Sequence, residues 1–343
     1  MSKLKLSFKP FTLELKHTFT VSVFSRTTTP IVLTEIEYDD LIGYGEAAMP
    51  AYLGETQETI MKFLSKVDLS KYDDVFDLEN ILKDIDLIEN GNTAAKASID
   101  IALHDLIGKI LNKPWYKIWG NDLKKIPYTS FTIGIDNKSM IEKKVKEAED
   151  FKILKVKLGR DNDKEIIQTI RKNTDVPLIV DINQGWKDKE LALEMIHWLK
   201  ENKVLLVEQP LPKEKIDETA WLKDKSPLPV IADESVQRFP DIIKIKDAFS
   251  GINIKLMKCT GMHEAYKMIE LAKKLNLKVL LGCMTETSCG ISAASHLSPL
   301  ADWVDLDGAL LIKNDVFKGA ELLNGKILPA ELPGIGVEKI YNN

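Results

Sequence analysis

The second half of the chain repeats one pattern, a short apolar run that ends in a charged side chain. The ends are Lys157, Asp181, Glu208, Asp233 and Lys255, and the gaps between them are 24, 27, 25 and 22 residues. A repeat of that length accommodates a strand, a loop, a helix and a second loop. Because the strands of a parallel βα array end along one rim, we expect three carboxylates there, with lysines on both sides. Three carboxylates that face one point repel one another unless a cation lies among them.

From Pro127 onward, short apolar runs alternate with longer stretches of helical periodicity, and Gly or Pro separates them. The runs that we interpret as strands cover residues 128–133, 153–158, 177–182, 204–208, 229–233, 252–256, 278–283 and 302–306. Helical stretches between them include residues 138–150, 163–173, 188–202 and 262–275. Eight strands with intervening helices are typical of a closed (β/α)8 barrel. An open doubly wound sheet is the alternative, but no Gly-x-Gly-x-x-Gly loop follows a strand.

The N-terminal part of the chain has a different pattern. Residues 3–16 and 31–38 alternate apolar and polar side chains, which predicts antiparallel strands joined through the polar stretch 26–30. We expect a turn at residues 43–46, helical structure at 58–87 and a helix at 93–111. The predicted fold class is therefore α/β, with an α+β capping domain at residues 1–125, a (β/α)8-type barrel at 126–315 and a C-terminal segment, 316–343, that returns to the cap.

Composition excludes several classes of protein. The net charge of −5 and the pI near 5.7 argue against a nucleic-acid-binding surface, which is normally basic. No apolar run reaches the roughly 18 residues of a membrane span, and the first residues lack the apolar core of a signal peptide. Cys259, Cys283 and Cys289 show no framework spacing, which indicates free thiols. We expect a cytoplasmic protein without nucleic-acid or membrane partners, and a homo-oligomer is compatible with the sequence.

The three acidic ends point to a metal site. Asp181, Glu208 and Asp233 end the third, fourth and fifth predicted strands. A single Asp at a strand end is more often a helix N-cap or a solvated loop residue. Three on consecutive strands at matching depth instead favour three oxygen ligands around one hard cation. Such ligands suit Mg²⁺, with Mn²⁺ as the alternative.

The lysines near these carboxylates are candidates for acid/base chemistry. Lys155 and Lys157 are two residues apart on one strand, so both side chains point to the same face. Two adjacent ammonium groups lower the pKa of at least one of them, and a nearby cation acts in the same direction. Solvated lysines that protect a strand edge are the alternative. Lys255 ends the sixth predicted strand, across the barrel, where a lysine in an apolar run is costly unless it is used.

This arrangement suggests a class of reaction. A metal that binds a carboxylate stabilises the enediolate formed when the α-proton leaves. Lysines on opposite faces of that carbon can remove the proton from one side and return it on the other, which inverts the carbon. Most of the required barrier reduction would be electrostatic.

Several motifs resemble the muconate-lactonising-enzyme subgroup of the enolase superfamily. They are Lys155-Val156-Lys157, Asp181-Ile182-Asn183-Gln184-Gly185, Val207-Glu208-Gln209-Pro210, Ala232-Asp233-Glu234-Ser235, Asn253-Ile254-Lys255 and the helical segment Ala97–Asp105. The resemblance covers essentially the whole chain. It implies metal ligands at Asp181, Glu208 and Asp233, and acid/base lysines at Lys157 and Lys255 with electrostatic help from Lys155. It also implies that Asn183 and Glu234 lie next to the metal ligands.

The subgroup hosts several reactions on the same lysines, so other residues must decide among them. Asp305 and Asp307 lie two apart at the end of the eighth predicted strand. This Asp-x-Asp resembles the mark of dipeptide epimerases, where it holds the free α-ammonium of the substrate. A solvated acidic loop is the alternative.

Specificity is expected from the cap loops and from the loops at the barrel mouth. Family members that act on Ala-Glu tend to carry an arginine in the first loop; Phe24 falls at that position by a rough count, with Arg26 two residues on, which favours an apolar or broader preference. The other candidate substrate-binding residues are Tyr52, Thr132, Met284 and Glu286, and an ordinary loop charge is the alternative for Glu286.

We therefore predict an Mg²⁺-dependent dipeptide epimerase that inverts the α-carbon of the C-terminal residue by 1,1-proton transfer. The alternatives are a syn-eliminating or cycloisomerising relative, similar to o-succinylbenzoate synthase or muconate-lactonising enzyme, and a non-catalytic barrel that binds small ligands. A Schiff-base lysine enzyme is disfavoured because it gives the carboxylates no role.

Overall fold

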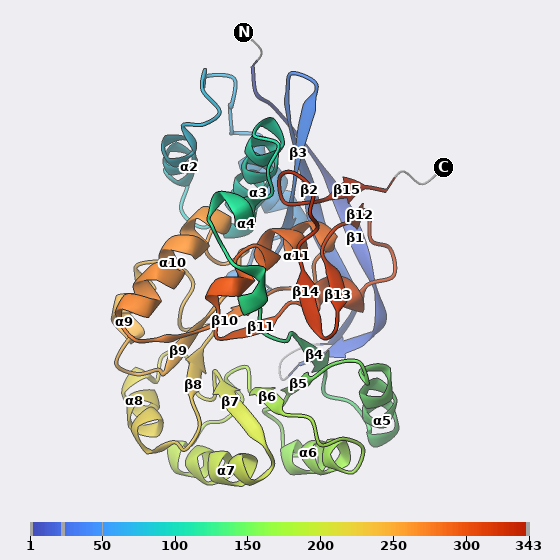
Figure 1. Cartoon of the computed structure of the whole chain (residues 1–343). Coiled ribbons are helices and arrows are strands. Elements are labelled where there is room, and N and C mark those ends of the chain that lie inside the picture. The colour runs from blue at the N-terminus through green and yellow to red at the C-terminus, as the bar shows by residue number, and fades with distance from the viewer. Residues whose placement is uncertain (1–2, 22–24, 50, 341–343) are drawn as a thin grey trace.

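A barrel of eight parallel strands forms the larger part of the molecule (Figure 1). The computed structural model describes residues 3–21, 25–49 and 51–340. The strands are β4 (Ser130–Ile133), β5 (Ile153–Lys157), β6 (Leu178–Asp181), β7 (Val204–Glu208), β8 (Val230–Ala232), β9 (Gly251–Ile254), β10 (Lys278–Gly282) and β11 (Trp303–Asp305). Their order in the sheet follows the chain, and a parallel bridge between Thr129 and Val304 joins the first strand to the last. All eight strands lie where the sequence predicts them, and the predicted fold class is confirmed.

Helices cover the outside of this sheet (Figure 1). They are α5 (Lys138–Glu147), α6 (Asp163–Arg171), α7 (Lys189–Glu201), α8 (Ile216–Lys225), α9 (Asp241–Ile245), α10 (Met262–Lys274) and α11 (Ser288–Ser295). Short 3-10 turns follow at η3 (Ser298–Leu300) and η4 (Gly308–Leu311). Most strand residues are buried on both faces, as in parallel sheets that helices enclose.

A three-stranded antiparallel sheet and a bundle of helices form the cap. The sheet contains β1 (Lys5–Thr20), β2 (Ser25–Tyr38) and β3 (Leu41–Ala48), in that order. The helical elements are η1 (Ala51–Leu53), α1 (Gln57–Leu64), α2 (Leu78–Asp86), α3 (Thr93–Ile110), α4 (Trp115–Ile118) and η2 (Leu123–Lys125). Two small strand pairs follow the barrel, β12 (Phe317–Lys318) with β15 (Glu338–Lys339) and β13 (Glu321–Leu323) with β14 (Lys326–Leu328).

Three local predictions in the cap are wrong. The stretch 26–30 is not a loop, because β2 already begins at Ser25 and pairs with Thr20. Residues 43–46 lie inside β3 and not in a turn, since their glycines allow close contact with α3, where a Cβ would collide with backbone carbonyls. The predicted helical stretch 58–87 is two helices, because Asp68 and Asp74 accept nearby backbone N–H groups and form turns between them.

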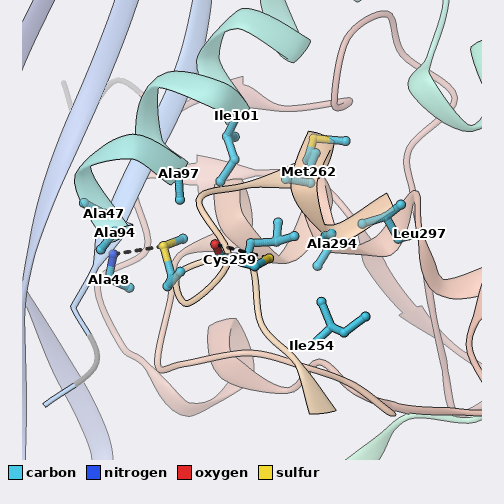
Figure 2. Packing of buried hydrophobic residues seen from close by; sticks show 14 of the residues in the cluster. Ala47, Ala48, Ala94, Ala97, Ile101, Ile254, Cys259, Met262, Ala294 and Leu297 are labelled. Atoms are coloured by element: carbon cyan, nitrogen blue, oxygen red, sulfur yellow. Dashed lines mark hydrogen bonds between the residues drawn. The ribbon is translucent and has the colours of Figure 1, made fainter. Parts of the chain in front are cut away.

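Buried apolar side chains join the cap to the barrel (Figure 2). Small residues of β3 and α3, such as Ala48 and Ala97, pack against the segment between β9 and α10 and against α11. Two carboxylates of the cap add polar contacts at this seam. Asp100 accepts backbone N–H groups at the start of α10, and Glu46 does the same at the start of α11. The cap therefore fixes the two loops that follow β9 and β10.

In the part of the chain that the structure describes, no helix combines the length and apolar character needed to cross a bilayer. The three cysteines are free, as predicted.

Candidate active site

The strand register brings the three predicted carboxylates together. Lys157 pairs with Asp181 across β5 and β6, and Asp181 pairs with Glu208 across β6 and β7. Asp233 directly follows β8, the next strand. The three carboxylates are at most 1% exposed, and one oxygen from each lies within 4.8 Å of the others.

Each of these carboxylates uses its two oxygens differently. One oxygen accepts a hydrogen bond from an outer donor: the backbone N–H of Asn183 for Asp181, the side-chain amide of Asn253 for Glu208 and the ammonium of Lys258 for Asp233. The second oxygen of each faces a lysine of the site. Asp181 Oδ2 lies 2.6 Å from Lys157 Nζ, Glu208 Oε2 lies 2.7 Å from Lys155 Nζ, and Asp233 Oδ2 lies 2.8 Å from Lys255 Nζ.

Burial and repulsion within the group act together on the pKa of Glu208. Burial and the charge of Asp181 raise this pKa above its ordinary value, against the attraction of Lys155. Glu208 Oε2 accepts no well-formed hydrogen bond from the described residues, although Lys155 lies beside it. A buried set of carboxylate oxygens, one of them without a directed donor, fits a hard dication such as Mg²⁺. Asp181, Glu208 and Asp233 would hold it.

The two predicted acid/base lysines come from opposite sides of the barrel. Lys157 ends β5 and Lys255 directly follows β9, four strands further along an eight-stranded sheet. Both side chains line the same cavity, together with Lys155. In a closed barrel, strands four apart face each other across the axis.

The electrostatic environment of these lysines differs from the expected one. Burial alone would lower the pKa of Lys155, but Asp305, Glu208 and Asp181 raise it well above its ordinary value. Burial likewise lowers the pKa of Lys255, but the charge of Asp233 raises it, and the net effect is a raised pKa. The lowering expected for at least one of Lys155 and Lys157 therefore does not occur at Lys155, because the carboxylates that surround it outweigh the effect of burial.

The Asp-x-Asp pair lines the same cavity as Lys155. Asp305 Oδ2 lies 2.8 Å from Lys155 Nζ, and Asp305 Oδ1 accepts a hydrogen bond from Ser130. Asp307 Oδ2 accepts the backbone N–H of Thr132 at 2.6 Å. Burial and the charge of Asp305 raise the pKa of Asp307 to about 7. The pair is thus buried against the barrel wall and is not a solvated loop.

The cavity has a volume of about 270 Å³ and collects most of the predicted specificity residues. Arg26, Tyr52, Thr132 and Met284 line it, as do Asn183 and Glu234. Arg26 Nη2 donates a hydrogen bond to Thr285 Oγ1 at 3.1 Å, which links the cap to the loop after β10. Phe24 lies outside the described residues.

Glu286 does not reach the cavity. Its side chain is 1% exposed, and Oε1 accepts the backbone N–H of Met284. Burial and the nearby Glu46 raise the pKa of Glu286 to about 8. The sequence suggested a substrate contact or an ordinary loop charge for Glu286. Neither describes it, because the side chain is buried where the cap meets the loop.

Glu234 and Asn183 lie beside the metal ligands. Asn183 Nδ2 donates to Glu234 Oε1 at 3.3 Å. Burial and the charge of Asp233 raise the pKa of Glu234 to about 8.

Models of two domain families match the chain. The mandelate racemase/muconate lactonizing enzyme N-terminal domain matches residues 9–120, and the enolase C-terminal domain-like family matches residues 140–339. The chain belongs to the mandelate racemase/muconate lactonizing enzyme family. Its strand-end carboxylates and lysines occupy the mouth of the barrel, as active sites do in folds of this kind.

Characterised relatives within this family include epimerases. An L-Ala-D/L-Glu epimerase of Bacteroides thetaiotaomicron is 60% identical over 339 residues, which cover 98% of this chain and 88% of that protein. A substrate-liganded L-Ala-D/L-Glu epimerase from Bacillus subtilis superposes with a TM-score of 0.91 at 28% identity and covers 98% of this chain and 99% of its own. A dipeptide epimerase from Cytophaga hutchinsonii, complexed with Mg and D-Ala-L-Val, superposes with a TM-score of 0.90 at 27% identity, with 99% and 96% coverage.

Two residues that contact the carboxylates were not predicted as site residues. Asn253 is two residues before Lys255 on the same strand face, so alternation along β9 could have indicated it. Lys258 follows Leu256-Met257 and is 1% exposed. A second lysine in an apolar segment was the available signal for it.

Proposed function

We propose that this member of the family is an Mg²⁺-dependent epimerase that inverts the C-terminal α-carbon of L-Ala-Glu dipeptides. The observation that carries the proposal is the position of three buried carboxylates between Lys157 and Lys255, which come from opposite strands of the barrel. An amine on each side of a bound carbon is what a 1,1-proton transfer with inversion requires.

Magnesium held by the three carboxylates would neutralise the negative charge that the substrate carboxylate gains when its α-proton leaves. The ion-paired side chains around this point carry equal numbers of positive and negative charges. Four carboxylates and four lysines form ion pairs in two groups. Asp181, Glu208 and Asp305 contact Lys155 or Lys157, and Asp233 contacts Lys255 and Lys258. A dication and a substrate carboxylate together add one positive charge, which lowers the pKa of the lysines toward the range of a base.

Lys157 and Lys255 would exchange protons with the α-carbon from its two sides. Lys255 Nζ contacts Asp233 Oδ2 and lines the cavity, so a small movement brings it to a bound substrate. Lys157 has the same relation to Asp181 Oδ2. Lys155 also contacts Asp305 and is 1% exposed, which suits a fixed positive charge better than a proton carrier.

The Asp-x-Asp pair would select a free α-ammonium group. Asp305 and Asp307 both line the cavity, and β11, which Asp305 ends, lies three strands from β8, which Asp233 follows. A dipeptide that places its carboxylate near the three metal ligands can extend its ammonium toward these two carboxylates. Two buried carboxylates favour a cation and reject a neutral acyl group.

Arg26 would bind an acidic side chain of the C-terminal residue. Its guanidinium lies in the cavity wall and stays positively charged near neutral pH, although burial lowers its pKa to about 10. The 60% identical relative is an L-Ala-D/L-Glu epimerase. Both points favour an acidic residue over the apolar or broader preference that counting from Phe19 suggested.

The direct test is incubation of L-Ala-L-Glu with the protein and Mg²⁺ in D₂O, followed by chiral analysis and mass spectrometry. We expect one deuterium at the C-terminal α-carbon, formation of L-Ala-D-Glu, and loss of both after chelation or in Asp233→Asn. Absence of deuterium uptake from Ala-Glu and from a dipeptide library would refute the proposal. A syn-eliminating or cycloisomerising enzyme would differ in another way, since its turnover would survive neutral replacements at Asp305 and Asp307.

A further inference from the structure

Lys258 makes four hydrogen bonds beside the three carboxylates, yet it does not line the cavity. Its side chain is 1% exposed. Nζ donates to Asp233 Oδ1 at 2.6 Å and to the backbone carbonyls of Asp233, Asn253 and Val236 at 2.8, 2.9 and 3.0 Å. One ammonium therefore joins the loop after β8, which carries Asp233, to the end of β9.

Lys255, three residues earlier, is held differently. Lys255 Nζ donates a hydrogen bond to Asp233 Oδ2 at 2.8 Å, and its side chain lines the cavity. Asp233 is thus clamped between two ammonium groups, one on each oxygen. The partners of Lys258 include three main-chain carbonyls, which can move only with the backbone, whereas the contact of Lys255 breaks by a side-chain rotation.

We propose that Lys258 is a positioning residue that fixes Asp233 Oδ1, so that Oδ2 is the single oxygen this carboxylate offers to a divalent cation. The same contact keeps Asp233 neutralised when Lys255 leaves it. Lys255 is then available to the substrate, a consequence that depends on the function proposed above. The positioning of Asp233 does not depend on it.

Removal of Lys258 should change Mg²⁺ affinity in opposite directions, depending on whether Lys258 acts as a charge or as a positioning group. If Lys258 acted only as a nearby positive charge, it would oppose a dication, and its removal would tighten Mg²⁺ binding. If it holds the ligand oxygen and its loop in place, its removal weakens binding, on the order of 10–100-fold for a residue that orients a metal ligand. Asn253 and the Asn183 backbone hold the other two carboxylates in the same one-oxygen manner.

Isothermal titration with Mg²⁺ on Lys258→Met tests this, since methionine keeps the length of the side chain and removes its donors. Lys96→Met is the matched control. Lys96 is 3% exposed and donates to Asp86 Oδ1 and to two backbone carbonyls, but it lies in the cap, away from the carboxylates. We expect Mg²⁺ affinity to fall by tenfold or more in Lys258→Met, in the range given for such residues, and to stay within twofold of wild type in Lys96→Met. Equal or tighter binding by Lys258→Met overturns the proposal.

A crystal structure of the wild-type chain with Mg²⁺ provides a second test that does not depend on folding of the variant. The proposal requires Lys258 Nζ to remain on Asp233 Oδ1 while Oδ2 contacts the metal ion and Lys255 has left it. Metal bound through Oδ1, or Lys258 displaced, contradicts it. Because both readouts use Mg²⁺ alone, they stay informative even if no dipeptide proves to be a substrate.

Discussion

Replacement of Arg26 by methionine should change which dipeptides are processed much more than it changes the chemistry. Arg26 lies between the cap and the loop after β10, with Nη2 on Thr285 Oγ1 and the guanidinium 5.9 Å above the ring of Phe19. The methionine variant keeps the apolar packing and loses the positive charge that we assign to the substrate's side-chain carboxylate.

The magnitude follows from the partial burial of Arg26. Exposed ion pairs are worth about 0–1 kcal/mol, and removal of one partner from a fully buried pair costs about 2–5 kcal/mol. Arg26 is partly buried in a cavity wall, so we expect a loss of about 2 kcal/mol, which corresponds to a roughly 30-fold decrease in kcat/KM.

The assay compares L-Ala-L-Glu with L-Ala-L-Gln, which has nearly the same shape and no side-chain charge. In Arg26→Met, kcat/KM for the Glu dipeptide should fall about 30-fold by the estimate above, while the value for the Gln dipeptide changes by less than about threefold. Equal losses for both dipeptides, or an unchanged preference for Glu, would refute the assignment of Arg26 to the acidic side chain.

Three further predictions concern pH and metal. Because the pKa of Asp307 is raised to about 7, its carboxylate forms as pH rises through 7, and KM for a free dipeptide should fall between pH 6 and 7.5; Asp307→Asn should raise KM and remove this dependence, and an unaltered pH profile would speak against an ammonium site. Glu286 has a pKa of about 8 in the folded chain, so the folded state keeps a proton that the unfolded state releases, and stability to urea should decrease as pH rises from about 4.5 toward 8. Glu286→Gln should flatten this slope, and an identical slope would show that another group is responsible. Mg²⁺ at about 100 times its Kd should stabilise the fold by about 2.7 kcal/mol, seen as a higher midpoint of thermal unfolding, whereas Glu208→Gln should lose most of this gain.

The barrel and its carboxylates were predictable because their signals are periodic. An apolar run with a charge at its end, repeated at the spacing of a βα unit, determines both the strand and the rim on which the charge lies. Asp181, Glu208 and Asp233 therefore appear together in the structure as they do in the pattern. The strand register then places these side chains at the same depth, since neighbouring parallel strands end together.

Contacts between distant segments were not predictable in this way. The sequence gives no sign that Asp305 contacts Lys155, and this contact helps to raise the pKa of Lys155. Glu286 was interpreted as a substrate contact or as a loop charge, but its neighbour Glu46 belongs to a cap strand some 240 residues earlier. The prediction of helical structure over 58–87 was wrong for a local reason. Two aspartates accept backbone N–H groups in turns that divide the stretch, and hydrophobic periodicity does not detect such turns.

The central claim is that two amines reach the substrate carbon from opposite sides, and half-reactions of single variants test it most directly. Lys157→Ala and Lys255→Ala should each be incubated with L-Ala-L-Glu and with L-Ala-D-Glu in D₂O and Mg²⁺. We predict that each variant fails to epimerise, yet still exchanges the α-proton of one diastereomer, and that the two variants retain opposite diastereomers. If both variants retain the same diastereomer, or if either still inverts the carbon, the two lysines do not act from opposed faces.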